Sequence, residues 1–437
     1  MKWRKAEVRS GPSNPTDAIT VGTRSDPFWA VEHACPECGT SSFIEDSDRY
    51  LECPCCRARL WIASRDSLAY RVISPEMPGR NVIHLPYWRF KAVGFACGSD
   101  GSVRCKSIDA ILPALNLEGI PSSPGTRPQA LRLSCVTPDT PGVFLSPDLP
   151  RSVVFSRMES AFPLAKEQFL DAPAPLRSYL EDFLSLVYFP FILEKNMLQD
   201  GLTGKTAARM GPEALDLLNA SRRHRGSRAQ FVPTVCPWCG ASLKGGRNSR
   251  VLSCGNCGTL WLGSKKGFLN LPFTLYEGEG DHWLPFWKVR TGGSKVRFDT
   301  LADLIALADL PKVVRDQDRR ETAFLWMPAF KIEPRLFLRI SKLLTVMQPR
   351  DGEGPLPKGE IHPAALSPEE ASGAVQPAIV NLTMNRRMLV PVLATFPMKA
   401  AETRLVLIPF REKGTELVQE SFRISINKNA LRFGMNL

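Results

Sequence analysis

Eight of the twelve cysteines form two copies of one spacing pattern, and this repeat restricts the possible folds more than any other feature of the 437 residues. In each copy, fourteen residues separate two C-x-x-C pairs. The first copy consists of Cys35, Cys38, Cys53 and Cys56, and the second of Cys236, Cys239, Cys254 and Cys257. Corresponding cysteines lie 201 positions apart throughout. The folded chain is therefore expected to bring four sulfur atoms together at two places.

Two C-x-x-C turns make up the ligand set of a structural zinc site. Zinc in such sites takes four soft ligands in a tetrahedron, and each turn delivers two of them from a tight loop. Glycines that favour the turn follow three of the four pairs, at Gly39, Gly240 and Gly258. A redox site needs only one such pair in a strand-to-helix context. The pattern predicts two structural zinc ions, each in a zinc ribbon with no open position for catalysis.

The remaining cysteines leave one ambiguity. Cys55 precedes Cys56, and either thiol can be the fourth ligand of the first site, although the match with Cys257 favours Cys56. We expect Cys97, Cys105 and Cys135 to behave as small buried hydrophobic residues. His33, two residues before the first ligand, is expected on the surface.

A second repeat follows each cysteine pattern. The segment H-L-P-Y-W-R-F-K (84–91) corresponds to W-L-P-F-W-K-V-R (283–290), at an offset of 199. Weaker versions occur at 187–193, 325–332 and 405–411, and each is a β-rich run with a proline inside it. The two repeats together predict an internal duplication. Because proline cannot donate to a ladder, we expect these strands at sheet edges or at bulges.

These signals predict an α+β, β-dominated fold of two related halves, each with a four-cysteine zinc ribbon followed by a β-rich barrel- or sandwich-like unit. The predicted units are a flexible tail (1–28), zinc ribbon 1 (29–62), a β-rich domain with helices (63–230), zinc ribbon 2 (231–263) and a second such domain (264–437). Pro-, Gly- and Ser-rich stretches at 121–150 and 349–366 predict a long loop and a linker.

Three helices are expected in the second half. One starts at Glu333-Pro334, because proline suits the first helical position. Its apolar face comprises Leu336, Ile340, Leu343, Leu344 and Met347, and its other side carries Arg335, Arg339 and Lys342. Another helix runs from about Thr300 to Leu310. The Ser367/Glu370 capping box indicates the third.

Positive charge is concentrated around the second ribbon. The formal net charge is +12, and residues 222–266 contain nine basic and no acidic residues. Such a block can meet the phosphates of a nucleic acid, or it can be a solvated linker between the halves. The candidate phosphate contacts are Arg222, Arg223, Arg225, Arg228, Lys244, Arg247, Arg250, Lys265 and Lys266.

The Trp-cation pairs of the second repeat also allow two interpretations. Trp88-Arg89 and Trp287-Lys288 can form stacking platforms for single strands, or they can alternate between the core and the surface of a strand, which we favour. No H-E-x-x-H, G-x-S-x-G or G-x-G-x-x-G constellation occurs, so we assign no catalytic residue and expect no enzyme.

Targeting signals are not evident. The sequence contains no run of about 18 apolar residues, which a membrane span requires. The basic N-terminus has no apolar stretch behind it, as a secretory signal would have. We therefore expect a cytoplasmic protein, in which cysteines serve as thiols and metal ligands.

The tandem ribbons resemble the rubredoxin-like zinc-ribbon group over about 27 residues in each half. A ribbon followed by an L-P-[YF]-W strand resembles uncharacterised bacterial zinc-ribbon proteins, some of them deltaproteobacterial. Segments similar to T-R-P-Q-A-L-R-L (126–133) and I-N-K-N-A-L (426–431) also occur in that family. The resemblance implies a bacterial origin and no particular chemistry.

The sequence favours a non-enzymatic scaffold or adaptor that holds two zinc ions and docks another macromolecule, most simply a protein. The alternative is a nucleic-acid-binding protein that uses residues 222–266 and the second ribbon. The identity of the partner and the oligomeric state are left open.

Overall fold

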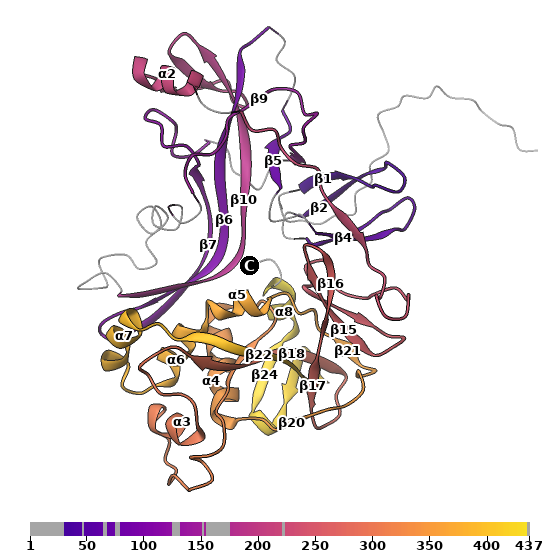
Figure 1. Cartoon of the computed structure of the whole chain (residues 1–437), viewed down its shortest axis with the longest axis vertical. Coiled ribbons are helices and arrows are strands. Elements are labelled where there is room, and N and C mark those ends of the chain that lie inside the picture. The colour runs from indigo at the N-terminus through magenta and orange to yellow at the C-terminus, as the bar shows by residue number, and fades with distance from the viewer. Residues whose placement is uncertain are drawn as a thin grey trace, which may run out of the picture.

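The computed structural model describes residues 30–45, 48–63, 68–74, 79–124, 132–150, 153, 175–220 and 223–434. Strands dominate, and most helices gather in the second half of the chain, so the α+β, β-dominated prediction is confirmed (Figure 1). The predicted tail, residues 1–28, lies outside the described residues.

The first half contains very long strands and one described α-helix longer than a turn. Its elements are β1 (Ala30–Ala34), β2 (Ser41–Glu45), β3 (Tyr50–Glu52), β4 (Arg59–Ile62), β5 (Ala69–Val72), β6 (Val82–Cys97), β7 (Val103–Pro113), β8 (Arg132–Cys135), β9 (Val143–Phe144), β10 (Leu176–Glu194), β11 (Met197–Asp200), β12 (Thr206–Arg209), α2 (Pro212–Ala220) and β13 (Phe231–Pro233).

The second half adds helices to a similar set of strands. Its elements are β14 (Val251–Cys254), β15 (Thr259–Ser264), β16 (Gly267–Leu271), β17 (Phe273–Tyr276), β18 (His282–Gly292), α3 (Leu301–Leu307), β19 (Leu325–Pro328), α4 (Pro334–Met347), β20 (Asp351–Gly352), β21 (Glu360–Ile361), α5 (Pro368–Ser372), α6 (Val375–Leu382), α7 (Arg386–Thr395), β22 (Lys399–Lys413), β23 (Glu416–Gln419), the 3-10 helix η4 (Glu420–Phe422), β24 (Ile424–Asn427) and α8 (Lys428–Gly434).

The large sheets are open. Among the described strands, a ten-stranded sheet runs β12-β11-β10-β5-β8-β1-β2. Strand β6 also pairs with β10, and β7 and β9 pair with β6. An eight-stranded sheet runs β19-β18-β22-β17-β20, with β21, β23 and β24 attached. Two three-stranded sheets belong to the ribbons, β13-β4-β3 and β14-β15-β16. None of these sheets closes into a barrel, so the barrel-like unit that we expected is wrong.

The long strands of the first half are buried on both faces. Strand β6 reads V-I-H-L-P-Y-W-R-F-K-A-V-G-F-A-C, and nearly every residue in it is buried. Side chains alternate between two cores, because successive residues of a strand point to opposite faces. Ile83, Leu85 and Tyr87 belong to one core, whereas Trp88 and Phe90 belong to the other.

Prolines occupy inner strands, contrary to the expected edges and bulges. Pro86 lies in β6 where its neighbour changes from β9 to β7, and Pro285 lies in β18 where β21 gives way to β19. Pro190 and Pro409 occupy the same kind of junction in β10 and β22. The missing N–H thus falls where a ladder is already interrupted. The carbonyl of Pro86 still accepts a hydrogen bond, from the Ala114 N–H at 2.9 Å.

The strand pairings around β6 and β18 correspond one to one. Two parallel pairs of the first half, β5–β10 and β6–β9, correspond to the parallel pairs β17–β22 and β18–β21 of the second. Five antiparallel pairs also correspond: β5–β8 to β17–β20, β6–β7 to β18–β19, β6–β10 to β18–β22, β10–β11 to β22–β23, and β11–β12 to β23–β24. Trp88 Nε1 donates to the Leu149 carbonyl at 3.1 Å, and Trp287 Nε1 donates to the Leu366 carbonyl at 3.1 Å. The predicted loop and linker supply the short strands β8, β9, β20 and β21.

The two halves share one core. The largest hydrophobic cluster combines the second sheet and its helices with Val93, Phe95 and Leu180 from the ends of β6 and β10. Figure 1 shows these strand ends reaching the helices α5, α6 and α7. At the tip of the β6–β7 hairpin, Arg387 Nε donates to the Asp100 carbonyl at 3.1 Å.

The ribbons also touch each other. Strand β13, at the start of the second ribbon, pairs with β4 of the first. The Arg49 N–H donates to the Arg247 carbonyl at 2.9 Å. Trp61 of the first ribbon is buried and packs against Phe268 at 6.0 Å between ring centroids. The backbone of Gly263 in β15 lies directly under the same indole.

The expected helix starts are confirmed. Glu333 caps α4, with Pro334 at its first position. Thr300 and Ser367 form capping boxes with Asp303 and Glu370 at the starts of α3 and α5. The buried face of α4 is rotated from the one predicted. It buries Phe337, Leu338, Ile340, Ser341, Leu344 and Thr345, whereas Leu343 is half-buried and Met347 is exposed.

Substitution of Gly263 by alanine tests the contact between the ribbons. A Cβ at this position would lie 2.3 Å from Trp61 Cζ2, so one of them has to move. Overpacking of this kind costs about 1–3 kcal/mol, and we expect Gly263→Ala to lower the free energy of local unfolding of both ribbons by that amount. Hydrogen exchange of the ribbon amides measures it.

Gly255→Ala is the matched control, because a Cβ there meets nothing within 4 Å and needs no left-handed backbone. If the two variants exchange their ribbon amides alike, Trp61 does not hold the ribbons together.

Candidate metal centres

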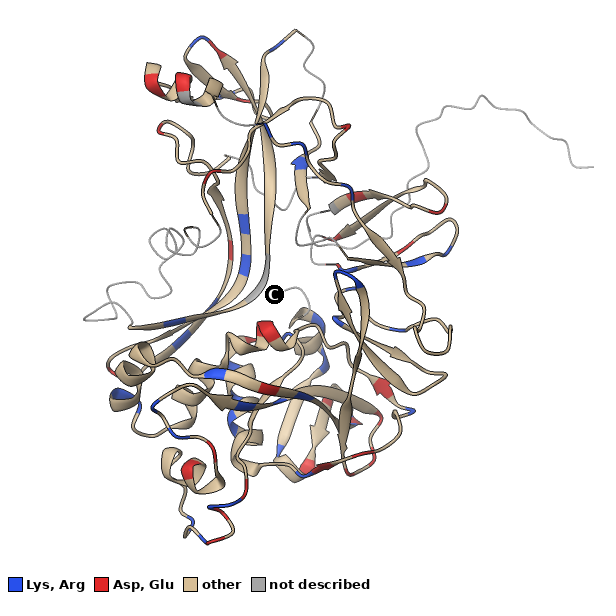
Figure 2. Cartoon of the chain, in the orientation of Figure 1, with Lys and Arg blue, Asp and Glu red and all other residues tan. Residues whose placement is uncertain are grey.

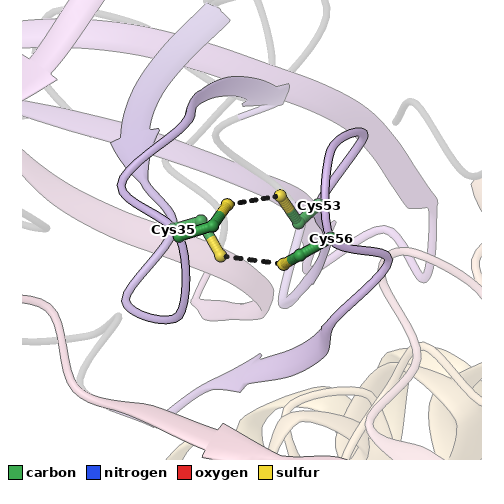
Figure 3. Close-up of side chains that lie close together, drawn as sticks. Cys35, Cys53 and Cys56 are labelled. Atoms are coloured by element: carbon green, nitrogen blue, oxygen red, sulfur yellow. Dashed lines mark hydrogen bonds between the residues drawn. The ribbon is translucent and has the colours of Figure 1, made fainter.

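The first cysteine set forms one compact cluster. Cys35 Sγ lies 3.7 Å from Cys56 Sγ, and Cys38 Sγ lies 3.6 Å from Cys53 Sγ. All four sulfur atoms lie within 4.8 Å of one another. Figure 3 shows the sulfur atoms of two loops facing each other across the site. The second loop presents Cys56 to the cluster, whereas the Cys55 thiol lies outside it and is exposed. Cys56, which the match with Cys257 favoured, is thus the thiol that could complete a metal site.

The second set repeats this arrangement. Cys236 Sγ lies 3.6 Å from Cys257 Sγ, and Cys239 Sγ lies 3.4 Å from Cys254 Sγ. Sulfur atoms bonded to one zinc ion at about 2.3 Å lie about 3.8 Å apart in a tetrahedron, whereas a disulfide needs about 2.05 Å. Both clusters therefore have the spacing of four ligands around one metal ion.

Burial alternates within each turn. The first cysteine of every C-x-x-C pair is buried and the second is exposed, in both clusters. The buried thiols pack on small apolar clusters, with Leu51 and Leu60 in the first ribbon and Leu243, Leu252 and Trp261 in the second. A metal ion in either site would thus lie between a small core and solvent, where it ties two loops to one sheet.

The left-handed backbone conformation of the turns explains why glycine follows three of the four cysteine pairs. Gly39 and Gly240 have φ of 75° and 74°, and their N–H groups donate to the carbonyls of Cys35 and Cys236. Gly258 has φ of 68° in the second pair of ribbon 2. In ribbon 1 the corresponding residue is Arg57, with φ of 62°. This side chain occupies a left-handed conformation that favours glycine.

Two exposed thiols are prepared for metal binding by their neighbours. Hydrogen bonding to the Thr40 side chain, and then to its backbone, lowers the pKa of Cys38 to about 6. The Asn256 side chain and the Ala241 backbone lower the pKa of Cys239 to about 6. Because the thiolate is the form that binds a metal ion, the lowered pKa of these thiols favours metal binding at each site.

The unpaired cysteines only partly meet expectation. Cys97 is buried, and Cys105 and Cys135 are half-buried.

His33 was expected on the surface, but it is buried. Its Nδ1 lies 3.6 Å from Cys135 Sγ, and its ring makes a T-shaped contact with Phe231. The β1 strand carries His33 into the large sheet, because β1 pairs with β8.

The basic segment is not a free linker. The His224 N–H donates to the Phe144 carbonyl at 2.8 Å, and the Ser227 N–H donates to the Val136 carbonyl at 3.0 Å. Arg223 and Arg225 are exposed along this stretch. Arg222 lies outside the described residues.

Two of the candidate phosphate contacts form ion pairs. Arg228 Nη2 lies 2.6 Å from Asp139 Oδ2 on the surface. Arg250 pairs with Glu370 at the start of α5, and the two side chains are only 14% and 13% exposed. Arg250 therefore joins the second ribbon to the helices.

The other candidates are exposed. Lys244 and Arg247 lie before β14, and Lys265 and Lys266 form the turn between β15 and β16. Figure 2 shows Lys and Arg spread over the ribbons, the long strands and the helices, with Asp and Glu among them. Of the nine predicted contacts, two therefore form ion pairs, and Arg223, Arg225, Lys244, Arg247, Lys265 and Lys266 are exposed.

The Trp-cation segments belong to the core. Trp287 is fully buried, and Trp88 nearly so. Arg89 is 3% exposed and pairs with Asp109 through Nη2 and Oδ2 at 3.0 Å. Lys288 Nζ lies 2.6 Å from Asp351 Oδ1. The stacking-platform interpretation is therefore wrong, and the tryptophans lie in the core as the favoured interpretation expects. The cations do not lie on the surface, because Arg89 is buried and Lys288 is half-buried.

The tips of the two ribbons differ in character. The knuckle of ribbon 2 exposes Val235, Pro237 and Trp238, and the Trp238 side chain is 72% exposed. The position of Trp238 is occupied by Glu37 in ribbon 1, also exposed. Only the second tip therefore presents an aromatic surface to solvent.

Comparison of the chain with family models, with curated proteins and with solved structures finds no match. In the part of the chain that the structure describes, no helix combines the length and the apolar character needed to span a bilayer.

Exchange of Arg57 for glycine should stabilise ribbon 1. The left-handed conformation costs a residue with a Cβ about 1–2 kcal/mol, and glycine adopts it freely although it loses more chain entropy on folding. We expect Arg57→Gly to raise the free energy of local unfolding by about 1 kcal/mol, measured by hydrogen exchange of residues 50–62.

Gly258→Ala is the opposite substitution in ribbon 2. Its Cβ would meet only Leu356, at 3.8 Å, so backbone strain alone should destabilise that ribbon by about 1 kcal/mol. Effects of the same sign in the two variants would contradict this account of the turns.

Proposed function

We propose that the chain is a non-enzymatic scaffold or adaptor that holds two structural zinc ions and docks another macromolecule. The observation that carries the proposal is the pair of four-cysteine clusters, each with its sulfur atoms at tetrahedral spacing. Four protein ligands complete such a site, which is the arrangement of structural rather than catalytic zinc. The sites then serve stability and presentation, and no residue is assigned to catalysis.

Zinc is the metal we propose for both sites. Tetrahedral sulfur sites suit zinc or iron. A scaffold role requires no redox chemistry of the metal ion. Zinc, which has no redox chemistry, therefore suits this role. Each ribbon buries only a small apolar cluster, and metal binding in such units contributes folding free energy directly.

The docking surface that we propose is the tip of ribbon 2, composed of Val235, Pro237 and Trp238. Tryptophan is enriched among the residues that dominate protein–protein binding energy. The metal-tied turn holds Trp238 in an exposed position, where its indole makes no contribution to the apolar cluster of its own ribbon. A protein partner with an apolar pocket fits this surface.

A nucleic acid is the alternative partner. The exposed Arg223, Arg225, Lys244, Lys265 and Lys266 favour it, because exposed cations can neutralise the phosphates of a nucleic acid. The ion pairs of Arg228 and Arg250 count against it, since those charges are already neutralised within the protein.

We further propose that the two halves arose by duplication of one ribbon-plus-sheet unit. The matched strand pairings and the equivalent Trp88 and Trp287 hydrogen bonds support this origin. Zinc ribbon 1 (29–62) and ribbon 2 (231–263) would then begin the two copies. A bacterial cytosol fits the twelve free thiols, because reducing compartments keep cysteines unpaired.

Site-specific photocrosslinking tests the docking proposal. A benzophenone amino acid replaces Trp238 in one variant and Glu37, its counterpart in ribbon 1, in the other. Both positions are exposed turn residues, so neither substitution should disturb the metal sites. After irradiation in cells, we expect a protease-sensitive adduct from position 238 and none of comparable yield from position 37.

The same experiment separates the two partner classes. An adduct from position 238 that is removed by nuclease would replace the protein partner with a nucleic acid. Equal yields from both positions, or no adduct from either, would contradict docking through ribbon 2.

A further inference from the structure

A cavity of about 610 Å³ lies where the first half meets the helices of the second. Val103 and Cys105 of β7 line one side, and Leu338, Leu343 and Val346 of α4 line the other. Strand β7 contacts both α4 and α6, so the cavity exists only when the two halves are docked. Its volume lies within the range of about 300–1,000 Å³ that is common for small-molecule sites.

The walls of the cavity are apolar. Periodicity assigns Leu343 and Met347 to the packed face of α4. Both line this cavity, and of the two only Leu343 also packs against the core. Met347 is 52% exposed. Apolar side chains left uncovered around a concave site mark a place where an apolar group can bind.

Four cations surround these apolar walls. Arg335, Arg339 and Lys342 lie on one face of α4, at spacings of four and three residues, and Arg386 reaches in from the start of α7. In the described part of the chain no Asp or Glu lines this cavity. Arg386 bonds to the carbonyl oxygens of Asn381 and Thr383 rather than to a carboxylate.

The cations are close enough to affect one another. Burial, and secondly the charge of Arg386, lowers the pKa of Lys342. A bound anion would stabilise the charged form of Lys342, which burial and a neighbouring like charge disfavour. The cavity thus offers apolar walls and a rim of four cations together, with Glu333 near enough to act on the Cys105 thiol.

We propose that this cavity binds a small amphipathic anion, with a carboxylate or phosphate head on the cations of α4 and α7 and an aliphatic chain along Leu338, Leu343 and Val346. An anion without a chain would leave the apolar walls wet, and an uncharged apolar ligand would leave the cations unpaired. This site is separate from the metal centres and from the ribbon 2 tip, so it does not depend on the proposed function.

Calorimetric titration of the full-length, metal-loaded protein with dodecanoate below its micellar concentration tests the proposal. The double variant Arg339→Gln, Lys342→Gln removes two head-group contacts, and the affinity should fall about tenfold for each, the typical effect of losing a hydrogen bond to a charged group. The matched control is Arg319→Gln, Arg320→Gln, which removes two exposed arginines outside the cavity. It should bind dodecanoate as the unmodified protein does.

Two further probes separate the head from the chain. Acetate carries the head alone and should bind far more weakly than dodecanoate. Dodecyltrimethylammonium carries the chain with the opposite charge and should also bind far more weakly. Equal binding of either probe, or an unchanged affinity in the Arg339/Lys342 variant, would overturn the amphipathic-anion site.

Cys105 provides a measurement that needs no substitution. Its thiol lines the cavity, whereas the exposed Cys55 lies in ribbon 1, outside both metal clusters. Dodecanoate should slow alkylation of Cys105 by N-ethylmaleimide and leave Cys55 unchanged, as mass spectrometry of the labelled peptides would show. Unslowed labelling of Cys105 at saturating dodecanoate would refute the site, even if the double variant failed to fold.

Discussion

Attraction between a metal ion and four thiolates is the interaction on which we propose that each ribbon depends. Two thiolates 4 Å apart repel each other by about 4 kcal/mol at an effective dielectric constant of about 20, and each cluster places its sulfur atoms at about this separation. The apolar support is small: among the described residues, Leu51 and Leu60 accompany the buried cysteines of ribbon 1, and Ile44, Ala58 and Phe231 pack against them. A shared cation removes the repulsion and closes both loops at once.

The ribbons are joined to the rest of the chain by contacts from several directions. Strand β13 pairs with β4, Trp61 packs over Gly263, and Arg250 reaches Glu370 of α5. The long strands β6 and β10 continue the connection, because their ends enter the core of the second half. We infer that loss of either metal would weaken contacts well beyond the ligating loops.

Local patterns predicted what depends on local chemistry. The cysteine spacing identified all eight members of the two sulfur clusters, and the capping residues Glu333, Thr300 and Ser367 identified three helix starts. The paired tryptophans were expected in strand cores, where they lie. In each case the residues that decide the structure are close together in the sequence or repeat at a fixed offset.

The wrong predictions concern choices between distant segments. Pro86 and Pro285 are tolerated in inner strands because a neighbouring strand ends beside them, and no local signal contains that information. Arg250 was assigned to nucleic-acid binding because it lies in a basic segment. Its ion-pair partner, Glu370, is 120 positions away, so the local sequence could not reveal the pair. The cavity under α4 arises in the same way, because β7 from the other half determines which side of the helix is covered.

The metal content of the purified chain tests the central claim most directly. Elemental analysis by mass spectrometry should find two zinc ions per chain, and removal of zinc by a chelator should release the hydrogen-exchange protection of both ribbons. Less than one metal ion per chain, iron in place of zinc, or ribbons that keep their protection after complete removal of the metal would contradict the account of two structural zinc centres.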